Sequence, residues 1–261
     1  MNASRKTRVV LSAIAIIVGV LLVAPTLVVI PMGFTDKRSL TFPPSGWSLR
    51  WYEEFFSNPE WIGSLGNSIA IAIAVTVLAV VLGTLAAVAL VRSRVPASGA
   101  INLLALAPLV VPIVVVGVGV YAMFLQWRLV GTFFGFVVAH TVLAVPYVVI
   151  TVSASLRTMD WGLLRAASSL GAGPWRAFRR VTLPQIAGGV AAGALFAFIT
   201  SFDETVVSLF LASSELRTLP VQMYGSVTRD TDPTIATASS LILVITTGLL
   251  LATLLRRKKH A

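Results

Sequence analysis

The sequence predicts an all-α membrane protein with six transmembrane helices. Of its 261 residues, 57% are hydrophobic and only 11% are charged, a composition that does not suit a water-exposed surface. About 20 apolar residues are needed to cross the hydrocarbon core as a helix, and apolar runs of that length occur six times. The predicted helices span residues 9–34, 62–91, 100–127, 132–156, 185–212 and 234–255. Little of the chain is left over, so we expect one transmembrane domain over residues 1–261.

The first run follows Arg5, Lys6 and Arg8, like the start of a secretory signal. Its apolar stretch is longer than the core of a signal peptide. We therefore interpret it as an uncleaved anchor.

The segment between the first two runs, residues 35–61, is rich in aromatic side chains, including Trp47, Trp51, Phe55 and Trp61. One interpretation is an aromatic belt at the level of the lipid headgroups, and the other is a surface that binds a partner.

Small residues and prolines inside the runs are ordinary features of membrane bundles. Gly189 and Gly193 form a small-xxx-small pair, and Pro108, Pro112 and Pro146 interrupt apolar helices. We interpret these residues as determinants of helix packing.

Orientation follows from the basic residues, because lysine and arginine accumulate in cytoplasmic segments. Fourteen of the 20 lysines and arginines fall in the N-terminal tail, residues 92–99, residues 157–184 and the C-terminal tail. Both termini are therefore expected in the cytoplasm. The net charge of +10 is largely a topology signal, and nucleic acid is not an expected partner because no water-soluble body carries a basic face.

Several chemistries are excluded by residue type. The chain has no cysteine, which removes disulfides, zinc-thiolate sites and thiol nucleophiles. Its two histidines, His140 and His260, are too few for a histidine metal cluster, and no nucleophile with a base is evident. We expect no catalytic residues, no metal site and no enzymatic activity.

The loop of residues 157–184 is structured rather than a simple linker. Met159, Leu163 and Leu170 recur at helical spacing with Ala166 and Ala167. Asp160 can cap the first turn and Gly171 can end the last, and a second short helix is expected over residues 174–181. This helix-bend-helix suits docking to a cytoplasmic partner, or anchoring to the membrane surface through its arginines.

The same loop resembles that of ABC importer permeases, in which Glu-Ala-Ala is followed by three residues, Gly, nine residues and Ile-x-Leu-Pro. Here Ala166 and Ala167 are followed by three residues, Gly171, nine residues and Val181-Thr182-Leu183-Pro184. The resemblance implies a type I ABC importer permease fold with a cytoplasmic coupling helix between transmembrane helices 4 and 5. That helix would contact the ATP-binding subunit. The implied coupling residues are Arg165, Ala166, Ala167, Gly171, Ala172, Leu183 and Pro184. Arg165 stands where the family has Glu, so an ion pair made by that Glu cannot form here.

Asp203 and Glu204 are the only formally charged residues within the six runs. A charged group in mid-membrane costs roughly 2.5–3.5 kcal/mol on insertion scales, so a functionless pair is unexpected. We predict that they line a pathway for a cationic substrate. Adjacent helical residues point about 100° apart, so both can do so only where the helix unwinds or meets another subunit. Two alternatives are pairing with arginines of another subunit and capping a helix break.

Stretches beginning at Ser48, Asn58, Ser201, Arg217 and Asp232 resemble the second permease subunit of spermidine/putrescine importers. The implied complex is a heterodimer with a related permease, two ATP-binding subunits and an extracytoplasmic binding protein, in a bacterial inner membrane. ATP and magnesium would bind the ATPase subunits, because this chain has no Walker lysine loop and needs no cofactor of its own. The alternatives are an importer permease for another small organic solute and an ion-coupled cation carrier.

Overall fold

A computed structural model describes residues 5–38, 42–92, 98–229 and 232–258. Apart from one isolated β-bridge between Thr35 and Trp47, the regular structure of these residues is helical, which confirms the predicted all-α class. The helices are α1 (Arg5–Met32), α2 (Arg50–Ser57), α3 (Pro59–Arg92), α4 (Ser98–Leu106), α5 (Ile113–Trp127), α6 (Phe133–Arg157), α7 (Trp161–Ser169), α8 (Pro174–Ala177), α9 (Leu183–Phe202), α10 (Val206–Leu211), α11 (Leu219–Arg229) and α12 (Thr234–Lys258).

Among the described residues, four helices are long and apolar enough to cross a membrane, and a fifth span is formed if a bent pair is counted. The four are Val10–Met32, Pro59–Arg92, Phe133–Arg157 and Pro174–Phe202. The sixth predicted run forms α12, whose described apolar part is the shorter stretch Thr234–Gly248. The predicted bounds of the first, second, fourth and sixth helices are correct to within a few residues.

The described chain separates into two compact units, residues 1–62 with 222–261 and residues 63–221. The expectation of one domain over residues 1–261 stays a prediction. In the first unit, α12 packs against α1 and α2. The Tyr52 hydroxyl lies 2.9 Å from Ser240 Oγ, and Thr237 Oγ1 donates to the carbonyl of Gly33.

The segment of residues 35–61 contains α2, a short amphipathic helix. Trp51 and Phe55 on α2 are buried, whereas Phe56 and the preceding Trp47 are exposed. An exposed aromatic row is compatible with both predicted roles, a headgroup belt and a partner surface, so the two remain open.

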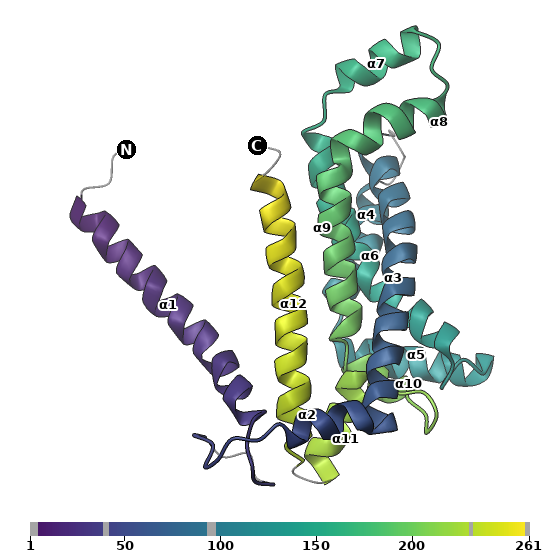
Figure 1. The fold of residues 1–261 in the computed structure, drawn as a ribbon. Coiled ribbons are helices and arrows are strands. Elements are labelled where there is room, and N and C mark those ends of the chain that lie inside the picture. Colours follow the sequence, from purple (N-terminus) through teal and green to yellow (C-terminus); the bar gives the residue numbers. More distant parts are fainter. Residues whose placement is uncertain (1–4, 39–41, 93–97, 230–231, 259–261) are drawn as a thin grey trace. The chain divides into compact units, whose positions relative to one another are not determined.

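The core of the second unit is the pair α6 and α9, which lie side by side (Figure 1). Glycines permit this close approach, since a Cβ atom on Gly193 would lie 2.7 Å from Thr151 Oγ1 and 3.1 Å from Val148 Cα. The prediction that Gly189 and Gly193 serve helix packing is confirmed. α6 starts at Thr132, whose hydroxyl accepts the Gly135 N–H, and continues through Pro146 without a break.

The third run, predicted as one helix over 100–127, is broken. α4 ends in a 3₁₀ turn, Ala107–Leu109, and α5 starts after Pro112, with a bend of 97° between the two parts. α4 itself ends at Leu106 and the 3₁₀ turn at Leu109. Proline has no N–H to donate and disfavours helical geometry in the preceding residue, so Pro112 keeps Val111 out of a helix and stands at the N-cap of α5. α5 ends at Arg128, whose φ is +55°.

The fifth run, predicted as one helix over 185–212, is also broken. α9 ends at Phe202 and α10 begins at Val206, so residues 203–205 are not helical. α10 packs against α5 and α6, and the Gly131 N–H donates to the Leu211 carbonyl at its end. These contacts pull the chain off the axis of α9, which places the two acidic residues at a break.

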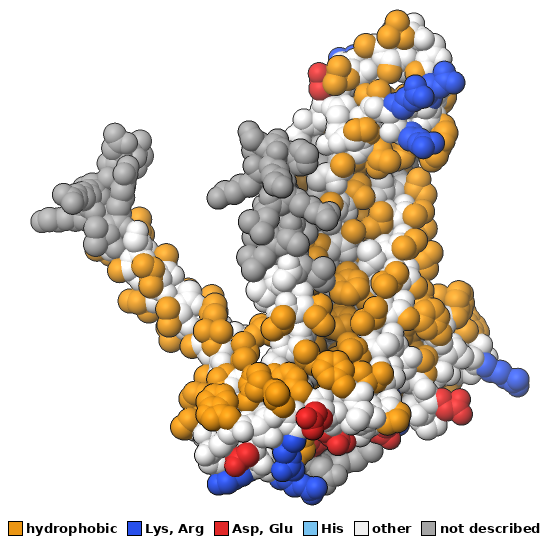
Figure 2. All heavy atoms as spheres, viewed as in Figure 1, with side chains coloured by type: hydrophobic (Ala, Val, Ile, Leu, Met, Phe, Trp, Pro, Cys, Tyr) orange, Lys and Arg blue, Asp and Glu red, His pale blue; other side chains and the backbone are white. Residues whose placement is uncertain are grey.

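Polarity divides the surface of the second unit. Apolar side chains cover the flanks of its long helices, and lysine and arginine side chains gather at the end that carries α7 and α8 (Figure 2). α5 and α10 lie at the opposite end of α9 (Figure 1). An apolar flank between two polar ends is the pattern expected of a bundle that spans a bilayer.

Candidate functional site

The acidic pair lies at the break between α9 and α10. Asp203 directly follows α9 as its C-cap, and its N–H still donates to the Ile199 carbonyl. Thr205 Oγ1 donates to the Asp203 carbonyl at 3.3 Å, which closes the short turn. Residues 203–205 are not helical, so the condition under which both acidic residues could line one pathway, local unwinding of the helix, is met.

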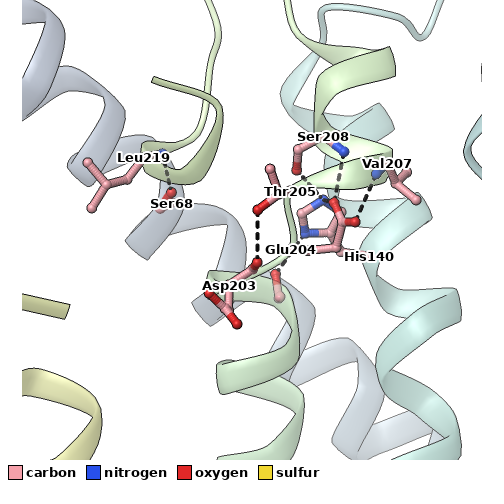
Figure 3. A network of polar contacts seen from close by, with 9 residues as sticks. Ser68, His140, Asp203, Glu204, Thr205, Val207, Ser208 and Leu219 are labelled. Atoms are coloured by element: carbon pink, nitrogen blue, oxygen red, sulfur yellow. Dashed lines mark hydrogen bonds and ion pairs between the residues drawn. The ribbon is translucent and has the colours of Figure 1, made fainter. Parts of the chain in front are cut away.

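Glu204 turns inward and caps α10. Its side chain is buried, and its two carboxylate oxygens accept the N–H groups of Val207 and Ser208, each at 2.8 Å (Figure 3). The first N–H groups of a helix have no partner within the helix, so a carboxylate at this position satisfies them and matches the helix dipole. The alternative predicted for the acidic pair, capping of a helix break, thus describes Glu204.

His140 on α6 contacts residues on both sides of the break. Its Nδ1 lies 3.0 Å from Ser201 Oγ and its Nε2 lies 3.1 Å from Ser208 Oγ. Nε2 also lies 3.6 Å from Glu204 Oε2. Sequence reasoning assigned His140 no role, because its partners are about 60 residues away in the chain and only the fold brings them together.

Asp203 differs from Glu204 in facing outward. Its side chain is exposed and points away from the cluster around His140 (Figure 3). It borders a cavity of about 600 Å³ within the second unit. The lining residues are Pro108, Leu109, Val111, Ile113, Leu143, Tyr147, Ile199, Thr200, Asp203, Glu204, Thr205 and Val206.

The cavity is built by both breaks. One wall is the bend between α4 and α5, and the other is the break between α9 and α10 with the facing side of α6. Tyr147, which the sequence did not single out, also lines this space, and its ring stacks on that of Phe196 at 6.2 Å. A carboxylate beside an aromatic ring and a threonine hydroxyl can hold an ammonium group by charge, by cation-π attraction and by a hydrogen bond.

The loop of residues 157–184 forms the predicted short helix. Asp160 caps α7 by accepting the Gly162 N–H at 2.7 Å, and Gly171 ends it with φ +81°. Leu164 is buried, whereas Leu163 and Leu170 are exposed at 53% and 88%. An exposed apolar face on a helix at the basic end of the molecule is suited to a protein partner.

The second short helix, predicted over 174–181 as a separate element, continues into α9. α8 is followed by the π-helical turn Phe178–Thr182 and then by α9 without interruption. Pro184 has no N–H for the usual bond to the residue four positions back, and a π turn accommodates that gap without ending the helix. A rigid connection therefore runs from the loop at one end to Asp203 at the other.

Arg165 lies on the exposed side of α7 and borders a cleft of about 550 Å³ together with Arg92 and Trp161. Ala166 next to it is exposed, and Ala167 and Ala172 are half-buried. Of the remaining predicted coupling residues, Leu183 and Pro184 lie at the start of α9. The coupling role of all of these residues stays a prediction.

Residues 79–260 match the family described as binding-protein-dependent transport system inner membrane component. The chain belongs to this family. It is therefore a permease, a multi-pass transport component of the membrane, as the spacing of the loop predicted. The match covers α6, the loop, both sides of the α9–α10 break and α12.

Individual relatives within this permease family differ in what they carry. The putrescine transport system permease protein PotI of Escherichia coli (strain K12) is 33% identical over 229 residues, which cover 85% of this chain and 81% of PotI. The spermidine/putrescine permease protein PotC of Haemophilus influenzae (strain ATCC 51907 / DSM 11121 / KW20 / Rd) is 28% identical, covering 95% and 97%. The molybdenum permease protein ModB of Mycobacterium bovis (strain ATCC BAA-935 / AF2122/97) is 34% identical, covering 79% and 81%.

The fold is also that of solved permeases. A chain of a bacterial ABC transporter involved in the import of the acidic polysaccharide alginate superposes with a TM-score of 0.72 at 14% sequence identity, over 99% of both chains. This likeness establishes the predicted ABC importer permease fold. It carries no information on the ligand.

Proposed function

We propose that this permease is one subunit of an ATP-driven importer that carries a polyamine, and that Asp203 is the carboxylate that binds it. The importer would contain a second permease subunit, two ATP-binding subunits that hold ATP and magnesium, and an extracytoplasmic binding protein. Both termini of this chain would face the cytoplasm of a bacterium. Membership of the permease family and the likeness to polyamine permeases support this assembly.

The observation that carries the choice of ligand is the charge of the cavity. Two acidic residues, Asp203 and Glu204, are among its lining residues, and no lysine, arginine or histidine is among the described ones. Identity alone leaves the ligand open, because relatives of similar identity carry putrescine and molybdenum. A negatively charged cavity repels an oxyanion and stabilises a cation that has lost part of its water.

The two carboxylates have different roles in this proposal. Glu204 already accepts two backbone N–H groups and lies against His140, whereas no hydrogen bond or ion pair of the Asp203 side chain is found in the described part of the chain. Asp203 is thus the carboxylate with capacity for a ligand. Tyr147 supplies an aromatic face, and Leu143 and Ile199 supply apolar walls for the methylene chain between ammonium groups.

The opposite end of the permease is proposed to bind the ATPase subunit through α7. Leu163 and Leu170 present the apolar face, and Gly171 allows the sharp turn that follows. The continuous helical path from Pro174 to Phe202 would carry movement of α7 to the break at Asp203. Binding of ATP would in this way change access to the cavity.

The test is polyamine uptake by the complete importer reconstituted in vesicles. Loss of one charge-assisted contact is worth roughly 1.5–3 kcal/mol, so Asp203→Asn is expected to raise the half-saturating polyamine concentration by roughly 10–100-fold. Glu215→Gln, an exposed acid outside the cavity lining, is the matched control and should behave as the parent protein.

Unchanged uptake by the assembled Asp203→Asn importer would refute the role of Asp203. Stimulation of ATP hydrolysis by a molybdate-loaded binding protein, with none by a polyamine-loaded one, would refute the polyamine assignment while retaining the importer. Uptake that persists without any ATPase subunit would refute the importer itself and favour an ion-coupled carrier.

A further inference from the structure

His140 is the one described side chain on α6 that hydrogen bonds to side chains on both sides of the α9–α10 break. Nδ1 reaches Ser201 in the last turn of α9, and Nε2 reaches Ser208 in the first turn of α10. The histidine, Ser201 and Ser208 are all buried, His140 and Ser208 completely so. A ring held at both nitrogens by partners on either side of a break fixes the distance between those sides.

The chemistry of imidazole suits this bridge. A neutral imidazole has one donor and one acceptor nitrogen, and a serine hydroxyl can serve either one, so both neutral tautomers satisfy both bonds. The facing charged group is Glu204, whose Oε2 lies 3.6 Å from Nε2 and which is itself held by the Val207 and Ser208 N–H groups. The imidazole, the carboxylate and the start of α10 thus form one connected buried network (Figure 3).

Asp203 and Glu204 are adjacent in the chain, so what holds one sets the direction of the other. Ser201, before Asp203, is hydrogen-bonded to His140, and Glu204, after it, is hydrogen-bonded to the start of α10. The backbone at Asp203 therefore has little freedom to turn its side chain away from the cavity. We propose that His140 is a positioning residue that holds this break in shape and thereby presents Asp203 to the ligand. The structural half of this inference is that His140 holds the break in shape. The ligand half is that the break so held presents Asp203 to the ligand, and only this half rests on the proposed function.

Two substitutions separate this role from simple filling of space. His140→Phe keeps a planar ring in a completely buried position but removes both hydrogen bonds. His140→Gln keeps one amide donor and one carbonyl acceptor at similar reach. If hydrogen bonding across the break is what matters, Gln restores what Phe loses, whereas a mere packing role predicts that Phe is the milder change.

The structural half is tested by thiol accessibility, which needs no ligand. Because the chain has no cysteine, Val207→Cys places a single reporter thiol at a completely buried position beside the network, and Ser214→Cys gives an exposed control. In the assembled importer, the rate at which a water-soluble maleimide labels the Val207→Cys thiol is expected to rise roughly tenfold with His140→Phe. With His140→Gln that rate should stay near the value for intact His140, and the Ser214→Cys thiol should label equally in all backgrounds.

The ligand half is tested by uptake kinetics in a double-mutant cycle. His140→Phe is expected to raise the half-saturating polyamine concentration by roughly tenfold in the parent protein and to add nothing in the Asp203→Asn background. An equal increase in both backgrounds would overturn the claim that His140 acts through Asp203.

Thiol labelling and polyamine uptake together distinguish a failure of the positioning role from a failure of the proposed function. Labelling of the Val207→Cys thiol that does not change with His140→Phe overturns the positioning role, whatever the ligand. If His140→Phe increases this labelling but Asp203→Asn leaves polyamine uptake unchanged, the positioning role of His140 is supported and the proposed function is refuted. If His140→Phe fails to accumulate in the membrane, Ser201→Ala with Ser208→Ala removes the same two bonds while keeping the imidazole, and the same labelling result is required.

Discussion

The contact between α6 and α9 gives a sharp test, because two adjacent glycines of α9 differ in their surroundings. A Cβ atom on Gly189 would lie 2.8 Å from the Thr151 carbonyl oxygen and 2.8 Å from Ser155 Cβ. A Cβ atom on Gly188 would meet nothing within 4 Å. Ala at these two positions therefore makes the same chemical change with opposite packing consequences.

The magnitude follows from two terms. Replacing glycine by alanine inside a helix stabilises it by about 1 kcal/mol at either position, so this term cancels in the comparison. Overpacking at Gly189 costs about 1–3 kcal/mol, since the obstructing atom is backbone and cannot rotate away. Gly189→Ala is expected to unfold roughly 2–12 °C below Gly188→Ala, using a shift of about 2–4 °C per kcal/mol for a chain of this size.

The measurement is thermal unfolding of both variants in the same detergent, with the parent protein alongside. Gly188→Ala should melt at or above the parent. A Gly189→Ala protein that melts as high as Gly188→Ala would show that α6 and α9 do not approach as closely as the structure has them, and would refute the reasoning.

Three further predictions concern the caps and turns. Glu204→Gln exchanges one carboxylate acceptor for an amide donor and leaves one buried N–H of α10 without a partner, so thermal unfolding should show a loss of about 1–3 kcal/mol; an unchanged melting temperature would contradict the capping geometry. Gly171→Ala forces a side chain into φ +81° and should lower transport per ATP hydrolysed, whereas Gly173→Ala, at φ −63°, should couple normally; equal coupling in both variants would count against the turn. Asp160→Ala removes the cap of α7 and should destabilise that helix by about 1 kcal/mol, seen as faster proteolysis of the loop; the same rate as the parent protein would argue against this cap.

Local features were predictable from the sequence because their causes are local. The six apolar runs, the Asp160 cap and the Gly171 turn each depend on a few neighbouring residues and on the thickness of a bilayer. The loop spacing from Ala166 to Pro184 was enough to identify the permease family. The residues that drew attention to the break, Asp203 and Glu204, stood out because charge is costly inside an apolar run.

The breaks themselves depended on tertiary structure. The third run is broken just before Pro112, whereas α6 continues through Pro146 and the helical path into α9 continues through Pro184 with a π turn. A proline by itself therefore does not decide whether a helix ends, continues or adopts a π turn. The length of the apolar run likewise extended the fifth helix to residue 212, since Phe, Thr and Ser are acceptable in a membrane helix. A helix break at the acidic pair was only one of the alternatives that the sequence allowed.

What the sequence by itself determined is the class of molecule: a helical membrane permease with an acidic pair in its fifth apolar run. What only the tertiary structure decided is that the two acidic side chains have different surroundings and therefore different roles. Glu204 meets His140 and the start of α10 and is occupied by them, whereas Asp203, one residue earlier, faces the cavity. The physical reason is that a carboxylate's role depends on its surroundings. Glu204 finds the free N–H groups of Val207 and Ser208 at 2.8 Å because the helix breaks, and His140, about 60 residues away in the chain, lies 3.6 Å from it.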